Sequence, residues 1–246
     1  MRHCVVTCWK RFEYSRITIL ALLACDPAMY VVAVDNGSPD ETGVWLDRMA
    51  AAMPERITVV HAGDNLGLWG GHNAGRECVS QYMSQHVTPD DLVGFSTNDC
   101  MHGPGCVAAL DAAVRAGVKR IIGTPAAKSQ PPGFTPWKCE VITDLSVAEQ
   151  WEQRWRRWWG PASAWALWST WSEIGPWPGP DAQRMGTLGL AQGYDVGYMG
   201  GLDFEIIGDE PHPLAALKLG PHADYWTKIK ALGASNPARL SQGDAK

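Results

Sequence analysis

The segment from Tyr30 to Ser38 constrains the fold of this chain more than any other. Tyr30–Val34 is apolar without interruption, and the run stops abruptly at Asp35-Asn36-Gly37-Ser38. A short apolar run bounded by a turn signal is typical of a strand buried on both faces of a parallel sheet. Asp35 would then lie at the carboxyl end of the strand, where open α/β sheets bind ligands. The segment therefore favours an α/β enzyme that acts on a nucleotide-like ligand.

The composition fits one large domain, or a domain with an appendage. The chain has 246 residues, of which 46% are hydrophobic, and a formal net charge of −5. General coating of nucleic acid needs clustered basic charge, so the acidic balance argues against it. The seven cysteines include no CxxC pair, which favours reduced thiols in a cytoplasmic protein. A zinc site at Cys100, His102 and Cys106 would match no standard finger.

The apolar segment from Ile17 to Cys25 allows two interpretations. It follows Arg16 and ends in Leu-Leu-Ala-Cys, as a lipoprotein signal does, but it is too short to span a bilayer. Cleavage at Cys25 would remove the segment expected to form the first strand. We therefore expect a buried or amphipathic helix, and no transmembrane segment in the chain.

Strand-like and helix-like segments alternate through the first half. The expected strands are His3–Cys8, Tyr30–Val34, Ile57–His61, Leu92–Ser96 and Arg120–Thr124. The expected helices are Phe12–Cys25, Thr42–Met53, Gly71–Gln85 and Pro104–Ala116. Such alternation implies right-handed βαβ units and an α/β fold with a mostly parallel central sheet flanked by helices. Within one compact domain, we expect a nucleotide-binding half at 1–125 and a smaller half at 126–246.

The loops after the first four strands would share one edge of the sheet. They read Thr7-Cys8-Trp9, Asp35-Asn36-Gly37-Ser38, Gly63-Asp64-Asn65 and Thr97-Asn98-Asp99. Polar loops are ordinary after strands, but three successive loops that place an Asp beside an Asn indicate a shared ligand site. Asp99 is the best metal candidate, because Mg²⁺ typically uses one or two carboxylates together with substrate phosphates. Alternatively, Asp99 caps the helix expected near Pro104.

A glycine-rich stretch, Asn65–Gly75, opens a helix whose backbone N–H groups could meet an anion. It is not the G-x-G-x-x-G fingerprint of dinucleotide-binding proteins. Gly103-Pro104-Gly105 fits that fingerprint only superficially, because it follows the fourth strand and lacks the acidic residue expected about 20 positions later. The chain also lacks a P-loop, so a Rossmann dehydrogenase and a P-loop NTPase are both excluded.

These motifs together resemble the family 2 glycosyltransferases, which have the GT-A fold. The resemblance covers about residues 3–125, with a weaker continuation to Tyr198. It rests on Val5–Arg11, Val34–Ser38, Asn65-x-Gly-x5-Asn73-x-Gly75 and Asn98-Asp99. It implies inverting transfer of a sugar from a UDP-, GDP- or TDP-sugar to an acceptor hydroxyl. That reaction needs Mn²⁺ or Mg²⁺ on the leaving diphosphate and a base that deprotonates the acceptor.

The resemblance also implies roles for individual residues. Thr7 and Asp35 would contact the nucleoside, Asp64 would lie near the base, and Asp99 would bind the metal. Four amide side chains of the same motifs are expected to line the donor site, namely Asn36, Asn65, Asn73 and Asn98.

The sequence departs from the family pattern at the metal and at the base. The first acidic position of the metal motif is Thr97, and the acidic pair that supplies the base reads Asp181-Ala182. Asp181 is therefore the candidate base, or alternatively the N-cap of a helix over 182–191. His212 is the candidate for the histidine that helps to hold the metal in related enzymes, although it lies a few residues late.

Tryptophan is concentrated in the second half, where nine of the 13 lie between Trp137 and Trp177. On a helix, four of them would share one face, namely Trp151, Trp155, Trp158 and Trp159. The stripe predicts a helix packed over the sheet or against a second subunit of a homodimer. It also suits a wall of the acceptor pocket, or an interfacial helix that touches lipid head groups.

The acceptor and two other functions stay open. The acceptor could be a saccharide, a lipid-linked glycan, a protein or a modified DNA base, since arginine beside aromatic residues also suits a flipped base. A nucleotidyltransferase could use a similar sheet. A non-catalytic module that binds a nucleotide sugar or nucleic acid is the third possibility, because acids are missing at positions 97 and 182.

Overall fold

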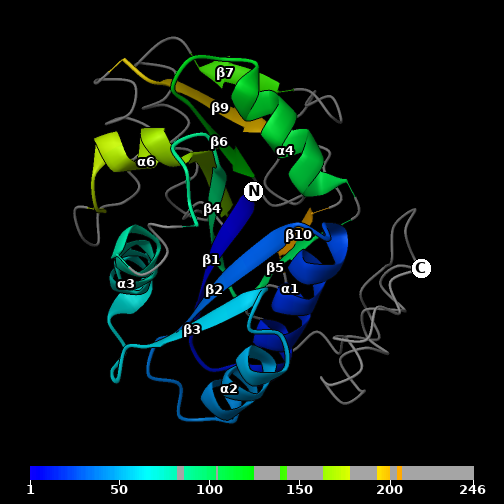
Figure 1. Cartoon of the computed structure of the whole chain (residues 1–246), viewed down its shortest axis with the longest axis vertical. Helices are drawn as coiled ribbons and strands as arrows, with labels where there is room; N and C mark the ends of the chain where they lie inside the picture. The colour runs from blue at the N-terminus through cyan, green and yellow to red at the C-terminus, as the bar shows by residue number, and fades with distance from the viewer. Residues whose placement is uncertain are drawn as a thin grey trace.

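Figure 1 shows the computed structural model of the chain. It describes residues 1–81, 86–103, 105–124, 139–142, 163–177, 193–199 and 204–206. Three predictions lie outside these residues: the tryptophan stripe at 151–159, the base Asp181 with its helix over 182–191, and the metal ligand His212. They stay predictions, as do the homodimer through the stripe and the division into two halves.

The described residues form an eight-stranded central sheet in the order β3-β2-β1-β4-β8-β6-β9-β7 (Figure 1). The strands of the first half are β1 (Arg2–Cys8), β2 (Met29–Asp35), β3 (Ile57–His61), β4 (Leu92–Thr97) and β6 (Arg120–Thr124). Each lies within one residue of its predicted bounds. The strands β3, β2, β1 and β4 are mutually parallel, which confirms the successive βαβ units.

The sequence did not predict the remaining strands. One of them, β8 (Ser163–Leu167), is antiparallel to both β4 and β6 and lies between them in the sheet. These two strands were predicted in succession along the chain, and β8 separates them. The others are β7 (Cys139–Ile142) and β9 (Asp195–Met199) in the same sheet, and β5 (Cys100–His102) paired with β10 (Phe204–Ile206) in a small second sheet. The central sheet is therefore parallel in its first half and mixed beyond β4.

Helices cover both faces of the sheet (Figure 1). One face carries α1 (Phe12–Cys25), α2 (Thr42–Ala52) and α4 (Cys106–Arg115), and the other carries α3 (Gly67–Gln81) and α6 (Trp168–Ile174). Alternate residues of β2 divide between the two cores: Val31 and Ala33 pack with α1 and α2, whereas Val32 and Val34 pack with α3. The prediction that this strand is buried on both faces is confirmed.

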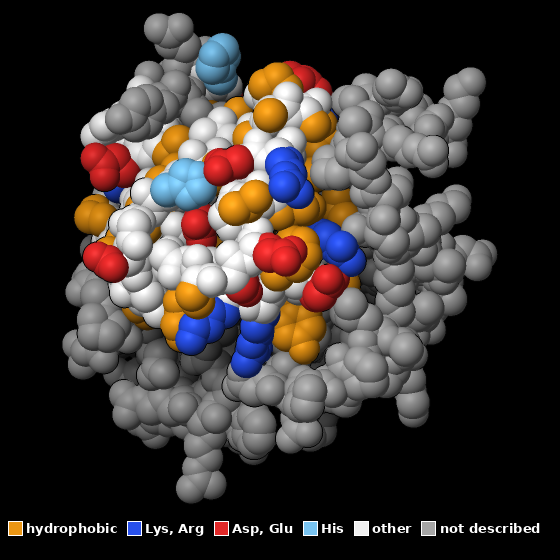
Figure 2. Space-filling view, turned by 90° about the horizontal axis from the view of Figure 1, so that it is seen from below, with side chains coloured by type: hydrophobic (Ala, Val, Ile, Leu, Met, Phe, Trp, Pro, Cys, Tyr) orange, Lys and Arg blue, Asp and Glu red, His pale blue; other side chains and the backbone are white. Residues whose placement is uncertain are grey.

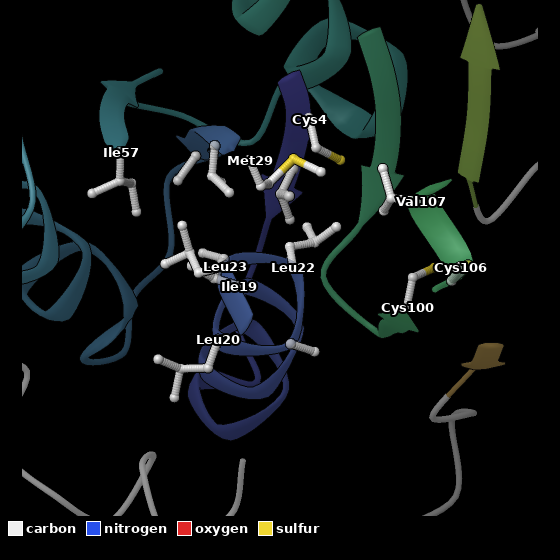
Figure 3. Packing of buried hydrophobic residues seen from close by; sticks show 14 of the residues in the cluster. Cys4, Ile19, Leu20, Leu22, Leu23, Met29, Ile57, Cys100, Cys106 and Val107 are labelled. Atoms are coloured by element: carbon white, nitrogen blue, oxygen red, sulfur yellow. The ribbon is translucent and has the colours of Figure 1, made fainter. Parts of the chain in front are cut away.

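The apolar segment that resembled a lipoprotein signal forms the C-terminal part of α1. Every residue from Ile17 to Leu23 is buried, and Figure 3 shows Leu22 and Leu23 close to Met29 of the sheet. Cys4, Cys100 and Cys106 extend this core, and these three cysteines are free thiols, as are Cys8, Cys25 and Cys78. Within the same residues, no helix combines the length and the apolar character needed to cross a membrane.

The predicted start of α3 at Gly71 was wrong by one turn, because the helix begins at Gly67. The glycines inside it allow close packing on the sheet. A Cβ atom on Gly75 would overlap Cγ1 of Val5 and lie 2.9 Å from Cγ2 of Val34, and one on Gly71 would overlap the side chain of Thr7. The glycine-rich composition, which was predicted to open a helix, here permits that helix to lie against β1 and β2.

Replacement of Gly75 by alanine is expected to destabilise the fold by about 1–3 kcal/mol, because the methyl group overpacks the contact between α3 and β1. Urea unfolding followed by circular dichroism measures the change. Glu77→Ala, on the exposed side of α3, is the control and should change the free energy of unfolding by less than about 0.5 kcal/mol. Equal midpoints for Gly75→Ala and wild type would contradict this packing.

Candidate functional site

The carboxyl ends of the first four strands meet at one edge of the sheet, as predicted. In the register of the strands, Asp35 lies beside Cys8 on one side and beside His61 on the other, and Thr7 lies beside Thr97. The four polar loops that follow these strands are therefore neighbours in space. This edge is the candidate site.

Thr7 and Asp35 belong to adjacent strands, but their side chains lie on opposite faces of the sheet. Thr7 faces α3, and its Oγ1 lies 2.7 Å from Nδ1 of His72. Burial lowers the pKa of His72 to about 3, so the ring is neutral at physiological pH. The buried Thr7 hydroxyl therefore ties β1 to α3, and its predicted contact with a nucleoside stays a prediction.

Asn36 joins the loop after β2 to the loop after β3. Its Nδ2 donates to Oδ1 of Asn65 at 3.0 Å and to the carbonyl oxygen of Gly67 at 3.1 Å, while its Oδ1 accepts from the backbone N–H of Leu66 at 3.0 Å. Asn36 is only 1% exposed. Its side-chain amide therefore bonds only within the protein here, and it fixes the position of the loop after β3 relative to the end of β2.

The two loops also touch directly. Gly37 has a φ of 71°, and a Cβ atom there would lie 2.6 Å from the backbone carbon of Asp64. Glycine is required on both counts, by the left-handed conformation and by the close approach. Asp64 is exposed at the rim, where it remains available for the predicted contact with the base of a nucleotide.

Asn98 fastens the loop after β4 to the loop after β1. Its Nδ2 donates to the carbonyl oxygen of Lys10 at 3.1 Å and to Oγ of Ser15 at 2.8 Å. The backbone carbonyl oxygen of Asn98 accepts from the hydroxyl of Thr18. Lys10 and Arg11 have φ values of 56° and 55°, a left-handed conformation that is costly for residues other than glycine. Strain of this kind is typical of functional sites, where the surrounding structure over-determines it.

Asp99 follows β4 at the same edge. Thr97 donates a hydrogen bond from Oγ1 to Oδ1 of Asp99, and Cys100 contributes a weak one at 3.7 Å. Burial raises the pKa of Asp99, against the smaller opposing effects of Thr97 and of the positive charge of Arg11. In the described part of the chain, no three His, Cys, Asp or Glu side chains cluster as a metal site, so Asp99 belongs to no such cluster there.

Asn73 does not join the other predicted residues. Its side chain accepts from the backbone N–H of Trp177 at 2.8 Å and donates to the carbonyl oxygen of Trp177 at 3.1 Å. Trp177 packs on the buried Phe95 and is stacked on Trp171 with a centroid distance of 5.2 Å. Asn73 thereby anchors α3 to the segment that follows α6.

The sequence analysis missed His61. Its ring lies between two carboxylates, with Nδ1 at 3.2 Å from Oδ2 of Asp35 and Nε2 at 2.9 Å from Oδ1 of Asp47 in α2. Its place as the last residue of the predicted strand Ile57–His61, level with Asp35, was the available signal. Figure 2 views the side on which α2 lies and shows acidic, basic and histidine side chains interspersed, with no large area of one charge.

The sequence and fold of this chain match those of known glycosyltransferases. Residues 4–164 match the model of glycosyl transferase family 2, and the chain belongs to that family. A curated relative, the polyprenol monophosphomannose synthase of Mycolicibacterium smegmatis, is 32% identical over 124 residues, which are 49% of this chain and 43% of the relative. The match therefore spans less than half of the relative's length.

Solved structures show the same fold at low identity. The mannosyltransferase PcManGT from Pyrobaculum calidifontis, in complex with GDP-Man and Mn²⁺, has a TM-score of 0.55 at 18% identity, over 98% of this chain and 64% of that one. GalNAc-T7 with UDP, GalNAc and Mn²⁺ has a TM-score of 0.60 at 11% identity, over 94% of this chain and 48% of that one. The predicted GT-A fold is confirmed.

Substitution of Asn36 by aspartate is expected to destabilise the protein by about 1–3 kcal/mol, because a carboxylate cannot donate to Asn65 and Gly67 and would remain buried beside their oxygens. Urea unfolding tests this. The control is Asp64→Asn on the exposed rim, which should leave the midpoint unchanged. If Asn36→Asp unfolds at the wild-type midpoint, the bridge between the loops does not stabilise the site.

Proposed function

We propose that this chain transfers a sugar from a nucleotide-sugar donor to an acceptor, with inversion at the anomeric carbon and with the help of a divalent cation. The single observation that carries the proposal is Asp99, a partly buried carboxylate at the carboxyl end of β4, on the rim formed by four strand ends. Membership of glycosyl transferase family 2 supports the reaction class.

The surroundings of Asp99 fit a divalent cation. Thr97 holds one carboxylate oxygen, which fixes the rotamer and leaves Oδ2 for a ligand. Burial disfavours the ionised form of Asp99, and a bound cation would reverse that effect. Mn²⁺ or Mg²⁺ held by Asp99 would neutralise the developing charge of the departing diphosphate, with phosphate oxygens and water completing its coordination.

The other rim residues would bind and orient the donor. Asp35 and Asp64 would meet the nucleoside, from positions fixed by the Asn36 bridge. In the transfer, an acceptor oxygen forms a bond to the anomeric carbon while the bond from that carbon to the diphosphate oxygen breaks on the opposite side. Asp181 would remove the proton of an acceptor hydroxyl, and His212 would assist at the metal; both assignments rest on the sequence alone.

The relatives suggest which donors and acceptors deserve the first trial. One forms polyprenol monophosphomannose by its name, and another was solved with GDP-Man and Mn²⁺, so a GDP-hexose heads the donor panel. A polyprenyl phosphate heads the acceptor panel, before a saccharide, a protein and a modified DNA base. An ionised phosphate acceptor would need no base, which would fit the incomplete acidic pair at Asp181-Ala182. The six free cysteines of the described residues support a cytoplasmic location.

The experiment is a donor screen with Mn²⁺ or Mg²⁺ that measures release of GDP, UDP or TDP with each acceptor. Release of a nucleoside diphosphate supports transfer or hydrolysis. Formation of pyrophosphate from a nucleoside triphosphate would instead indicate a nucleotidyltransferase. A thermal shift with nucleotide sugars but no turnover would indicate a binding module.

Asp99→Asn is expected to lower kcat by about 100-fold or more, because the cation loses a charged ligand and the diphosphate loses its stabilisation. Calorimetry of Mn²⁺ binding to the protein with nucleoside diphosphate should show a parallel loss. Asp90→Asn, at the opposite end of β4 and exposed, is the control and should keep wild-type kcat and metal affinity. Wild-type turnover by Asp99→Asn would contradict the proposal.

A further inference from the structure

Three ionisable side chains from three elements form a hydrogen-bonded chain that begins at the candidate site. They are Asp35 at the end of β2, His61 at the end of β3 and Asp47 in α2, joined through the two ring nitrogens of His61. The exposed fraction of the side chain rises along this line, from 12% for Asp35 to 47% for His61 and 61% for Asp47. The imidazole therefore connects a buried carboxylate of the site with a carboxylate in solvent.

This arrangement suits a protonated ring. An imidazolium donates from both nitrogens, whereas a neutral imidazole has one donor and would face one carboxylate with a lone pair. The hydrogen bond to Asp47, followed by that to Asp35, raises the pKa of His61 above 6.5 despite partial burial. These two carboxylates, from β2 and α2, are the charged groups of the described residues that face the ring.

The Asp35 carboxylate has little freedom to choose another position. Its Oδ1 accepts from the backbone N–H of Ser38 at 3.0 Å, and its Oδ2 faces His61. On the side of α2, a Cβ atom on Gly43 would lie 2.5 Å from Oδ2, so only glycine leaves room for the carboxylate there. Ser38 in turn accepts from the backbone N–H of Lys10, which connects this orientation to the loop after β1.

We propose that His61 is a positioning residue of the donor site, which bridges Asp35 to Asp47 and so fixes the Asp35 carboxylate in the orientation that receives the nucleoside. The inference rests on the proposed function, because that function assigns the nucleoside to Asp35. His61 does not itself touch the donor. Its effect passes through the charge and the hydrogen bond that it gives to Asp35.

The sign of the resulting pH dependence follows from the raised pKa. Below about pH 6.5, the unperturbed value, the ring is charged and both hydrogen bonds are present. As the pH rises through the higher pKa of the folded protein, the ring loses its second donor and the bridge is broken. Nucleotide affinity should therefore fall as the pH rises through that raised pKa, and the stabilisation that the bridge gives to the fold should disappear over the same range.

The test combines calorimetry with NMR on the full chain. Affinities for GDP and for UDP, each with Mg²⁺, are measured from about pH 5.5 to about pH 8.5, together with the titration of the His61 ring, the Asp35 carboxyl carbon and the Ser38 amide. For the nucleotide that binds, we expect wild-type affinity to fall about threefold to tenfold over this range, as loss of one charge-assisted hydrogen bond would produce. The Asp35 and Ser38 signals should follow the His61 ring.

Three variants separate positioning from general stability. His61→Gln removes the titration and should give an affinity that changes only with the nucleotide's own ionisation. Asp47→Asn removes the largest cause of the raised pKa, so the fall in affinity should move to lower pH. Gly43→Ala should displace Asp35 and weaken binding at every pH, while the His61 ring still titrates. The control is His86→Gln, an exposed histidine outside this line, which should match wild type.

Two outcomes would overturn the inference. One is a wild-type affinity with the same pH profile as His61→Gln, and the other is a His61 titration that leaves the Asp35 and Ser38 signals unchanged. If neither nucleotide binds at any pH, the proposed function fails. The NMR titration then still decides whether His61 controls Asp35, because it needs no ligand.

Discussion

The side-chain amide of Asn36 is the interaction on which the rest of the site depends. It holds Asn65 and Leu66 of the loop after β3, and Gly67 at the start of α3, against the end of β2. Buried polar groups are stable only when their hydrogen bonds are satisfied, so this amide sets one relative position of the two loops. Asp35 precedes Asn36 in the chain and Asp64 precedes Asn65, so this constraint also fixes the positions of both carboxylates.

The same principle recurs around the rim. Asn98 ties the strained Lys10-Arg11 loop to the end of β4, and Asn73 ties α3 to Trp177. Asparagine suits this work because one side chain both donates and accepts, so it can replace missing backbone partners in loops that have no regular pairing. The carboxylates Asp64 and Asp99 and the half-exposed imidazole of His61 are then the groups left at the surface for chemistry or charge.

Much of the fold could be predicted, because the first half has a simple physical pattern. Each of its strands is a short apolar run that ends in a turn signal, and burial on both faces of the sheet leaves little choice of structure. The start of α3 was misplaced because Gly67 and Gly70 have low helix propensity, which the close packing of this helix on β1 overrides. The strand β8 was missed because Trp165, whose ring covers Gly94 on β4, belongs to a tryptophan-rich region that gave no strand period.

The sequence by itself determined which residues reach the edge of the sheet, because parallel strands bring their carboxyl ends together whatever packs around them. It thus identified Asp35, Asp64 and Asp99 and the family to which they belong. Only the tertiary structure decided which way each side chain points and what it touches. Thr7 and Asp35 face opposite sides of the sheet, four asparagines bind their own protein, and His61 meets Asp47 of a helix 14 residues earlier in the chain. Such contacts depend on register and on helix packing, which no local pattern of residues specifies.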